Sequence, residues 1–409
     1  MGPPMDASLT HDHGLPRGLI ILFAVACGAM VANIYYAQTL IEQIGPDIGL
    51  SPQSAGLITT LTQLGYGAGL ALFVPLGDLF ENRRLALIAL SGAVLGTLGI
   101  AASQGPISFL LASVLTGLCS TGAQILLPLA THLTPRHRQG AVIGQVMSGL
   151  LAGIMLARPL ASFAAALIGW RAIFVLSAFV MILIGIILAL RCPQRRPETR
   201  IHYLTLIGSV WRQLGDYRAL RLRAFYQALL FAAFNLFWTT APLALIHHFG
   251  LTQTGIAIFA LAGAGGALIA PMAGRLADQG RGWMTTLIAL AGSAAMFLIA
   301  DFAVAMTGIA IFALTAILID AAVQANQITG QRIIFGLSSH ARGRVNAAYM
   351  TSIFLVGASG SVIGTVAYET FGWTGTALAG LTLCAIPLLA FLLFDRGASR
   401  TDHPPKPAS

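Results

Sequence analysis

Long apolar stretches separated by short polar ones run the whole length of this chain. A helix needs about 20 residues to cross the hydrocarbon core of a bilayer. By that measure the apolar stretches predict twelve spanning helices, near residues 18–41, 53–76, 84–103, 107–133, 140–167, 171–190, 222–246, 253–275, 283–301, 304–331, 343–367 and 373–394. We therefore predict an all-α membrane protein with two six-helix bundles, 18–190 and 222–394. A polar linker, 191–221, joins the bundles, and short tails lie at 1–17 and 395–409.

The linker carries a weaker hydrophobic pattern of its own. Its apolar residues recur at helical spacing and fall on one face. They are Tyr203, Leu204, Ile207, Val210, Trp211 and Leu214. With arginines nearby, such a helix is expected to lie flat on the inner membrane surface.

Composition and charge fit a membrane protein. The chain is 56% hydrophobic and 9% charged, whereas soluble domains carry roughly 25% charged residues. Its net charge of +9 would suggest a nucleic-acid partner in a soluble protein, but the basic residues lie between the spans. All except Arg158 and Arg171 fall on the side that holds both termini, and this bias places that side in the cytoplasm. We expect a multi-pass protein of the bacterial inner membrane, surrounded by lipid, without a nucleic-acid partner.

Nothing in the sequence indicates catalysis. The cysteines show no metal-ligand spacing; they are Cys27, Cys119, Cys192 and Cys384. No phosphate-binding GxxxxGK[ST] motif is present, which disfavours pumping driven by ATP. We expect no enzyme activity, no cofactor and no metal.

The two halves repeat one another. Matching residues occupy matching places at separations of 202, 200 and 204 residues: Asn33 with Asn235, Asp78 with Asp278, and Arg138 with Arg342. Such a repeat is typical of secondary transporters, whose halves move around a site near the middle of the membrane.

The loop residues make the resemblance specific. The segment Gly274–Arg281 opens with G-x-L-A-D and resembles the signature loop of the major facilitator superfamily, and the loop around Asp78 is a more divergent copy. The segments 35–38 and 153–159 resemble the drug- and sugar-efflux branch, although Arg158 stands where antiporter branches have glycine. The resemblance implies the twelve-helix transporter fold, a small-molecule substrate and, in our interpretation, a monomer.

The same resemblance implies a cytoplasmic gate. In the family, the aspartate of the first loop meets the start of the eleventh helix, here near Arg342 and Arg344, because a carboxylate bonds well to arginines and helix N-termini. The predicted gate residues are Asp78, Arg83, Arg84, Asp278 and Arg281. The alternative is a solvated turn that only sets topology.

Two charged residues fall deep inside the predicted spans, away from their ends. A charge at the bilayer centre costs at least about 2.5–3.5 kcal/mol, so it is expected to have a role. Asp320 lies midway along the tenth span, and Gln324, Gln327 and Gln331 continue its stripe at helical spacing. Arg158 lies in the fifth span, and we expect it to pair with Asp320 in at least one state.

In the family that the chain resembles, the first, fourth, seventh and tenth helices line the central cavity. The cavity candidates on these helices are Asn33, Tyr36, Gln38, Gln124, Gln227, Asn235, Trp238, Gln324 and Gln327. The alternative for the amides is hydrogen bonding between helices, which stabilises membrane bundles. Tyr36 and Trp238 could stack on a flat ligand or simply pack.

These observations favour a proton-coupled exporter of a drug, sugar or metabolite. Asp320 is the candidate proton site, since a desolvated carboxylate is readily neutralised by a proton. One alternative is a uniporter or anion carrier in which Arg158 binds the substrate. Another is a membrane receptor that transports nothing.

Overall fold

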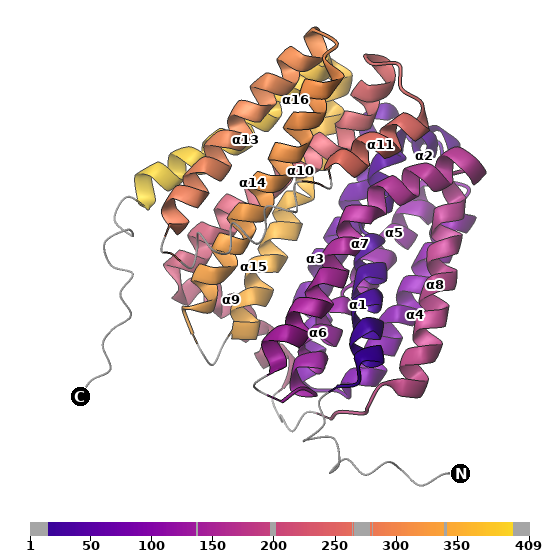
Figure 1. Cartoon of the computed structure of the whole chain (residues 1–409), viewed down its shortest axis with the longest axis vertical. Coiled ribbons are helices and arrows are strands. Elements are labelled where there is room, and N and C mark those ends of the chain that lie inside the picture. The colour runs from indigo at the N-terminus through magenta and orange to yellow at the C-terminus, as the bar shows by residue number, and fades with distance from the viewer. Residues whose placement is uncertain are drawn as a thin grey trace. The chain divides into compact units, whose positions relative to one another are not determined.

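The computed structural model describes residues 15–135, 138–196, 202–263, 265, 279, 281–338 and 342–395. In this part of the chain the regular structure is entirely helical (Figure 1). Each of the twelve predicted spans contains helix, interrupted by short turns in some of them, and the helix of the eighth is described only as far as Gly263. The prediction of an all-α fold with twelve spanning segments is confirmed.

The helices of the first half follow the predicted spans with a few interruptions. They are α1 Arg17–Ala32, η2 Tyr36–Thr39, α2 Ile41–Asp47, η3 Pro52–Ser54, α3 Leu57–Leu72, η4 Val74–Asp78, α4 Asn82–Ala102, α5 Pro106–Ser120, α6 Ala123–His132, α7 Gln139–Ile168 and α8 Trp170–Arg191.

The helices of the second half begin with the amphipathic helix of the linker. They are α9 Tyr203–Asp216, α10 Arg218–His247, α11 Gln253–Gly263, α13 Gly282–Ala305, α14 Ile309–Phe335, α15 Arg342–Gly357 and α16 Ser359–Phe394. Inside α16, Gly372 has a φ of 65°, which only glycine adopts without strain. At this kink the eleventh predicted span meets the twelfth.

By their internal contacts the residues form two compact units. The first comprises Met1–Leu50 and Leu61–Gly208, and the second comprises Ser51–Thr60 and Ser209–Ser409. In the second unit, the hydroxyl of Thr60 donates to the carbonyl of Ala358 at 2.8 Å. The short segment 51–60 therefore packs with helices that follow it by some 300 residues, which no pattern in the sequence indicated.

The first predicted span is not one continuous helix. α1 ends at Ala32, and the chain continues through a turn into η2. Irregular backbone is tolerated at membrane depth only where protein covers it. Residues 33–40 are all buried, and the side chains of Asn33 and Gln38 find partners on α8 and α7. These partners explain how the break is accommodated.

Glycines bring helices into close contact in both units. In the first, Gly149 and Gly153 of α7 face Ala24 and Gly28 of α1, and a Cβ on either α7 glycine would overlap a carbonyl oxygen of α1. In the second, a Cβ on Gly357 would meet the ring of Phe231 on α10. Gly153 and Gly357 are separated by 204 residues, like the repeated loop arginines.

The outer surface of the helices suits lipid. Nine helical segments among the described residues are long and apolar enough to cross a membrane. Large apolar side chains such as Ile107, Leu167 and Leu190 are more than 70% exposed. In water such surfaces would associate, whereas in a bilayer they face the acyl chains.

Candidate functional site

An acidic side chain lies inside the second unit, in the middle of α14. Asp320 is 8% exposed, and its Oδ1 accepts a hydrogen bond of 2.6 Å from the indole Nε1 of Trp238 on α10. The structure thus brings together two residues that the sequence singled out separately, one as the proton site and the other as a cavity aromatic.

The amides of the second unit connect α10 with α14 and α15. Gln227 is fully buried; its Nε2 donates to the Oε1 of Gln327 at 3.2 Å, and its Oε1 accepts from Asn326 at 2.7 Å. Asn235 donates to the carbonyl of Gly357 at 3.0 Å. Gln324 and Gln327 are half-buried. Gln227 and Asn235 therefore make bonds between helices, and Gln324 and Gln327 keep part of their surface exposed.

In the first unit, the amides of Asn33 and Gln124 also bond to neighbouring helices. Asn33 accepts a hydrogen bond of 2.6 Å from Ser177 and directs its Nδ2 toward the sulfur of Met181, both on α8. Gln124 donates to the hydroxyl of Tyr66 on α3 at 3.2 Å. These contacts join the end of α1 to α8, and α6 to α3.

Arg158, the charged residue of the fifth predicted span, lies on α7. Arg158 is 3% exposed, and its Nε donates to the Oε1 of Gln38 at 2.9 Å. Its guanidinium lies 5.2 Å from the ring centre of Tyr35, within the range of a cation–π interaction. The structure places two predicted site residues, Gln38 and Arg158, in contact. The predicted pairing of Arg158 with Asp320 stays a prediction.

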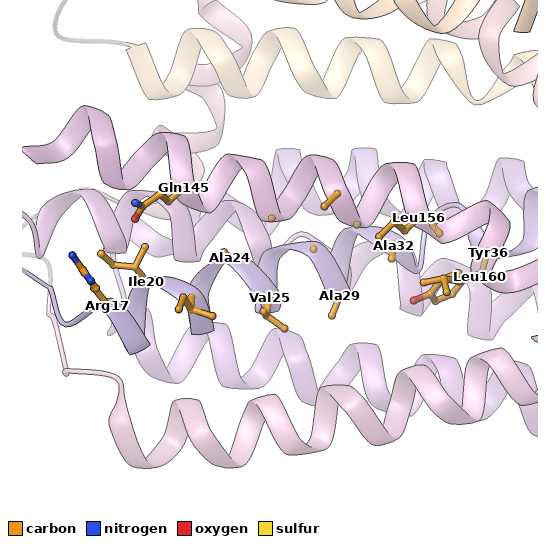
Figure 2. Close-up of a pocket in the computed structure, with 16 residues that line it drawn as sticks. Arg17, Ile20, Ala24, Val25, Ala29, Ala32, Tyr36, Gln145, Leu156 and Leu160 are labelled. Carbon is orange, nitrogen blue, oxygen red and sulfur yellow. The ribbon is translucent and has the colours of Figure 1, made fainter. Parts of the chain in front are cut away.

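A cavity of about 500 Å³ opens along α1 and α7 (Figure 2). Arg17 and Gln145 lie toward one end of it, and Tyr36 and Leu160 toward the other. The remaining lining residues are Ile20, Ile21, Ala24, Val25, Gly28, Ala29, Ala32, Gly149, Ala152, Gly153, Leu156 and Ala157. Of the predicted cavity residues, Tyr36 lines this space.

The loop between the second and third spans holds the start of the linker. Arg83 donates to the carbonyl of Cys192 at 3.1 Å, and the backbone N–H of Asn82 donates to the carbonyl of Arg195 at 3.1 Å. Arg84 pairs with Glu81 at 3.1 Å. Arg83 and Arg84 thus bond to partners in their own unit. The loop motif did not predict these partners.

The remaining predicted gate residues are Asp78, Arg281 and Asp278. Asp78 is an exposed residue at the end of η4, and Arg281 is an exposed residue that immediately precedes α13. Asp278 lies outside the described residues. The gate stays a prediction.

Arg171, one of the two exceptions to the charge bias, bonds to a nearby carboxylate. Its Nη1 bonds to the Oδ2 of Asp47, which also accepts a hydrogen bond of 2.9 Å from Trp170. Arg171 in turn donates to the carbonyl of Ser103 at 2.9 Å. The hydrogen bond from Arg171 and then that from Trp170 lower the pKa of the Asp47 carboxyl.

The structure also reveals a buried ion pair that sequence reasoning missed. Arg223 of α10 bonds to Asp395 at 3.2 Å and to the hydroxyl of Thr286 at 2.7 Å. Both charged side chains are almost fully buried. The sequence offered no sign of this pair, because Arg223 stands at the very start of the seventh predicted span and Asp395 at the start of the tail.

Comparison with known proteins identifies relatives along the whole chain. The model of the Major Facilitator Superfamily matches residues 18–270 and 223–409. The chain is 41% identical over 383 residues to "Uncharacterized transporter YgaY" of Escherichia coli O157:H7, covering 93% of this chain and 96% of that protein. It is 30% identical over 378 residues to "Probable transporter SCO4007" of Streptomyces coelicolor, covering 90% and 85%.

A solved structure shares the fold. The crystal structure of a D-xylose-proton symporter superposes with a TM-score of 0.75 at 14% identity, over 91% of this chain and 96% of that chain. At this identity the likeness speaks for the fold alone.

Proposed function

We propose that this chain, which belongs to the major facilitator superfamily, exports a small organic molecule across the bacterial inner membrane in exchange for protons. Its family makes it a transporter and not an enzyme. The exchange with protons is the finer part of the proposal. It is carried by one observation, the buried carboxylate of Asp320 in the middle of α14 with an indole N–H bonded to it.

The position of Asp320 favours a proton site over a purely structural carboxylate. Burial favours the neutral form of a carboxyl, whereas a hydrogen bond from a donor such as an indole N–H favours the ionised form. Asp320 is subject to both effects, because it is buried and accepts the bond from Trp238. A carboxyl in such surroundings can change its protonation state at modest cost.

The substrate is proposed to bind near the middle of the membrane and to be released by alternating access. Among the predicted cavity residues, Tyr36 lines a cavity, and Gln124, Gln324 and Gln327 keep part of their surface exposed. They offer an aromatic face and amide groups, which suit a small organic molecule. Gln227, Asn33, Asn235 and Gln124 contribute to the site by holding its helices in register.

A second candidate function is the transport of an organic anion. The observation that favours it is the buried guanidinium of Arg158, held between Gln38 and the ring of Tyr35. In this function Arg158 would bind the anionic group of the substrate when the site opens. Transport would then carry net charge and respond to the membrane potential.

The experiment begins with a resistance screen, because the substrate class is the first unknown. The chain is expressed in a bacterial host that lacks its main efflux pumps, and growth is scored against toxic metabolites, sugars, nucleosides and drugs. The proposal expects resistance to at least one compound, lost on removal of the proton gradient. Resistance that persists without a proton gradient but collapses with the membrane potential would favour the anion carrier.

A further inference from the structure

The indole of Trp238 is held from three sides besides its bond to Asp320. Phe237 packs against it edge-to-face at 5.8 Å, and Phe259 of α11 does so at 6.1 Å. The third side is the backbone of Gly263, also on α11, where an added Cβ would overlap the six-membered ring of the indole. Trp238 itself is 1% exposed. The position of its N–H is therefore set by α11 as well as by α10.

We propose that Trp238 is the positioning residue for Asp320 and couples the charge of that carboxylate to α11 through its contact with Gly263. The inference rests on the proposed role of Asp320 as the proton site. An N–H donor stabilises the ionised carboxylate more than the neutral acid. Loss of the proton therefore tightens the bond that draws the indole toward α14, and gain of the proton loosens it.

The close fit at Gly263 transmits a shift of the indole ring to α11. Packed interiors do not deform smoothly, so a side chain that shifts forces its neighbours to shift. With no side chain at Gly263, the indole rests directly on the α11 backbone. Movement of the ring toward or away from Asp320 then changes the packing of α11.

Among the described helices, those packed most extensively against α14 are α10, α11, α13 and α15. Their titratable or charged residues, with those of α14 besides Asp320, are Arg218, Arg221, Arg223, Tyr226, His247, Asp301, Arg332, Arg342, Arg344 and Tyr349. Arg332 is twelve residues from Asp320, about 18 Å along the helix. Tyr349 lies against Gly330, and Asp301 accepts a hydrogen bond from Thr374 of α16.

A spectroscopic test needs no knowledge of the substrate. The purified protein is labelled with 5-fluorotryptophan at its five tryptophans, and fluorine NMR spectra are recorded from about pH 4 to pH 9, a range that covers an ordinary and a raised carboxyl titration. The Trp238 resonance is assigned by replacing Trp170, Trp211, Trp283 and Trp373 with Phe one at a time, so that Trp238 is never altered.

We expect the Trp238 resonance to follow a single titration in the wild type and to be independent of pH in Asp320→Asn. Trp373 is the internal control, because it packs in the same aromatic cluster but its Nε1 has no hydrogen-bond partner among the described residues. Its resonance should not titrate. A Trp238 resonance that ignores pH, or that titrates equally in Asp320→Asn, would overturn the inference.

A second variant tests the link to α11. Gly263→Ala inserts a methyl group against the indole and should weaken its bond to Asp320, which moves the midpoint of the Trp238 titration to higher pH. Gly292→Ala on α13 is the control, since no atom lies within 4 Å of its added Cβ. An unchanged midpoint in Gly263→Ala contradicts the coupling to α11.

Failure of the inference is distinguishable from failure of the proposed function. If Asp320→Asn abolishes gradient-driven transport while the Trp238 resonance ignores pH, Asp320 is the proton site and the inference is wrong. If the titration of the Trp238 resonance is lost in Asp320→Asn but this variant still couples transport to the gradient, the inference holds and the proposed function is wrong.

Discussion

Gly153 and Gly28 meet at the contact between α7 and α1, where a Cβ on Gly153 would overlap the Gly28 carbonyl. We expect Gly153→Ala to force the two helices apart and to cost about 1–3 kcal/mol of stability, the usual effect of overpacking. The measurement is the thermal unfolding of the purified protein in detergent. Gly144→Ala is the matched control on the same helix, because no atom lies within 4 Å of its added Cβ. Equal unfolding temperatures for the two variants would contradict the close contact.

The buried pair Arg223–Asp395 should stabilise the end of the second unit only as a pair. Asp395→Asn leaves the arginine buried without its counter-ion, and such a loss typically costs about 3–5 kcal/mol. Arg223→Gln should cause a similar loss. The double variant Arg223→Gln/Asp395→Asn should be more stable than either single variant. Thermal unfolding of all three measures the coupling, and purely additive losses would contradict it.

The pair Asp47–Arg171 predicts a dependence of stability on pH. Because the folded protein lowers the pKa of Asp47, the pair stabilises the fold above the unfolded carboxyl pKa of about 3.9. That contribution is lost as pH falls through the lower folded pKa. The difference in unfolding temperature between wild type and Asp47→Asn should be constant from about pH 5 to pH 8 and should shrink below about pH 4. A difference that shrinks already near neutral pH would contradict the assignment; Glu42→Gln on the same helix controls for a generic effect of charge.

The orientation of the chain is a further prediction from the arginine bias. With Cys27, Cys119, Cys192 and Cys384 replaced by Ser, a single cysteine is placed at Gly105 or Gly250 for the outer side, or at Asn82 or Gln194 for the inner side. We expect a membrane-impermeant thiol reagent to label the first two in intact cells and the second two only after permeabilisation. Labelling of Asn82→Cys in intact cells would reverse the orientation.

Much of the fold follows from local patterns in the sequence. The length of the apolar stretches predicts the twelve spans, and the repeated loops predict two related halves, because both depend on residues close together in the chain. The break after Ala32 was not predicted, since apolar residues continue through it and its polar groups are satisfied by α7 and α8. Local hydropathy carries no information about such distant partners.

The candidate site was predictable in its residues but not in its contacts. Asp320 and Arg158 stand out because a charge inside an apolar span is rare. Their partners, Trp238 and Gln38, are 82 and 120 residues away along the chain, and only the folded structure brings them together. The same holds for Arg223 and Asp395, whose burial depends on where α10 and α16 pack.

Proton coupling through Asp320 is the central claim, and transport in liposomes tests it most directly. The compound found in the resistance screen is supplied to proteoliposomes of wild type and Asp320→Asn, first at equal pH on both sides and then with a pH gradient. We predict that both proteins exchange the compound at equal pH, but that only the wild type accumulates it against its concentration when the gradient is imposed. Accumulation driven by the gradient in Asp320→Asn would show that the proton is carried elsewhere.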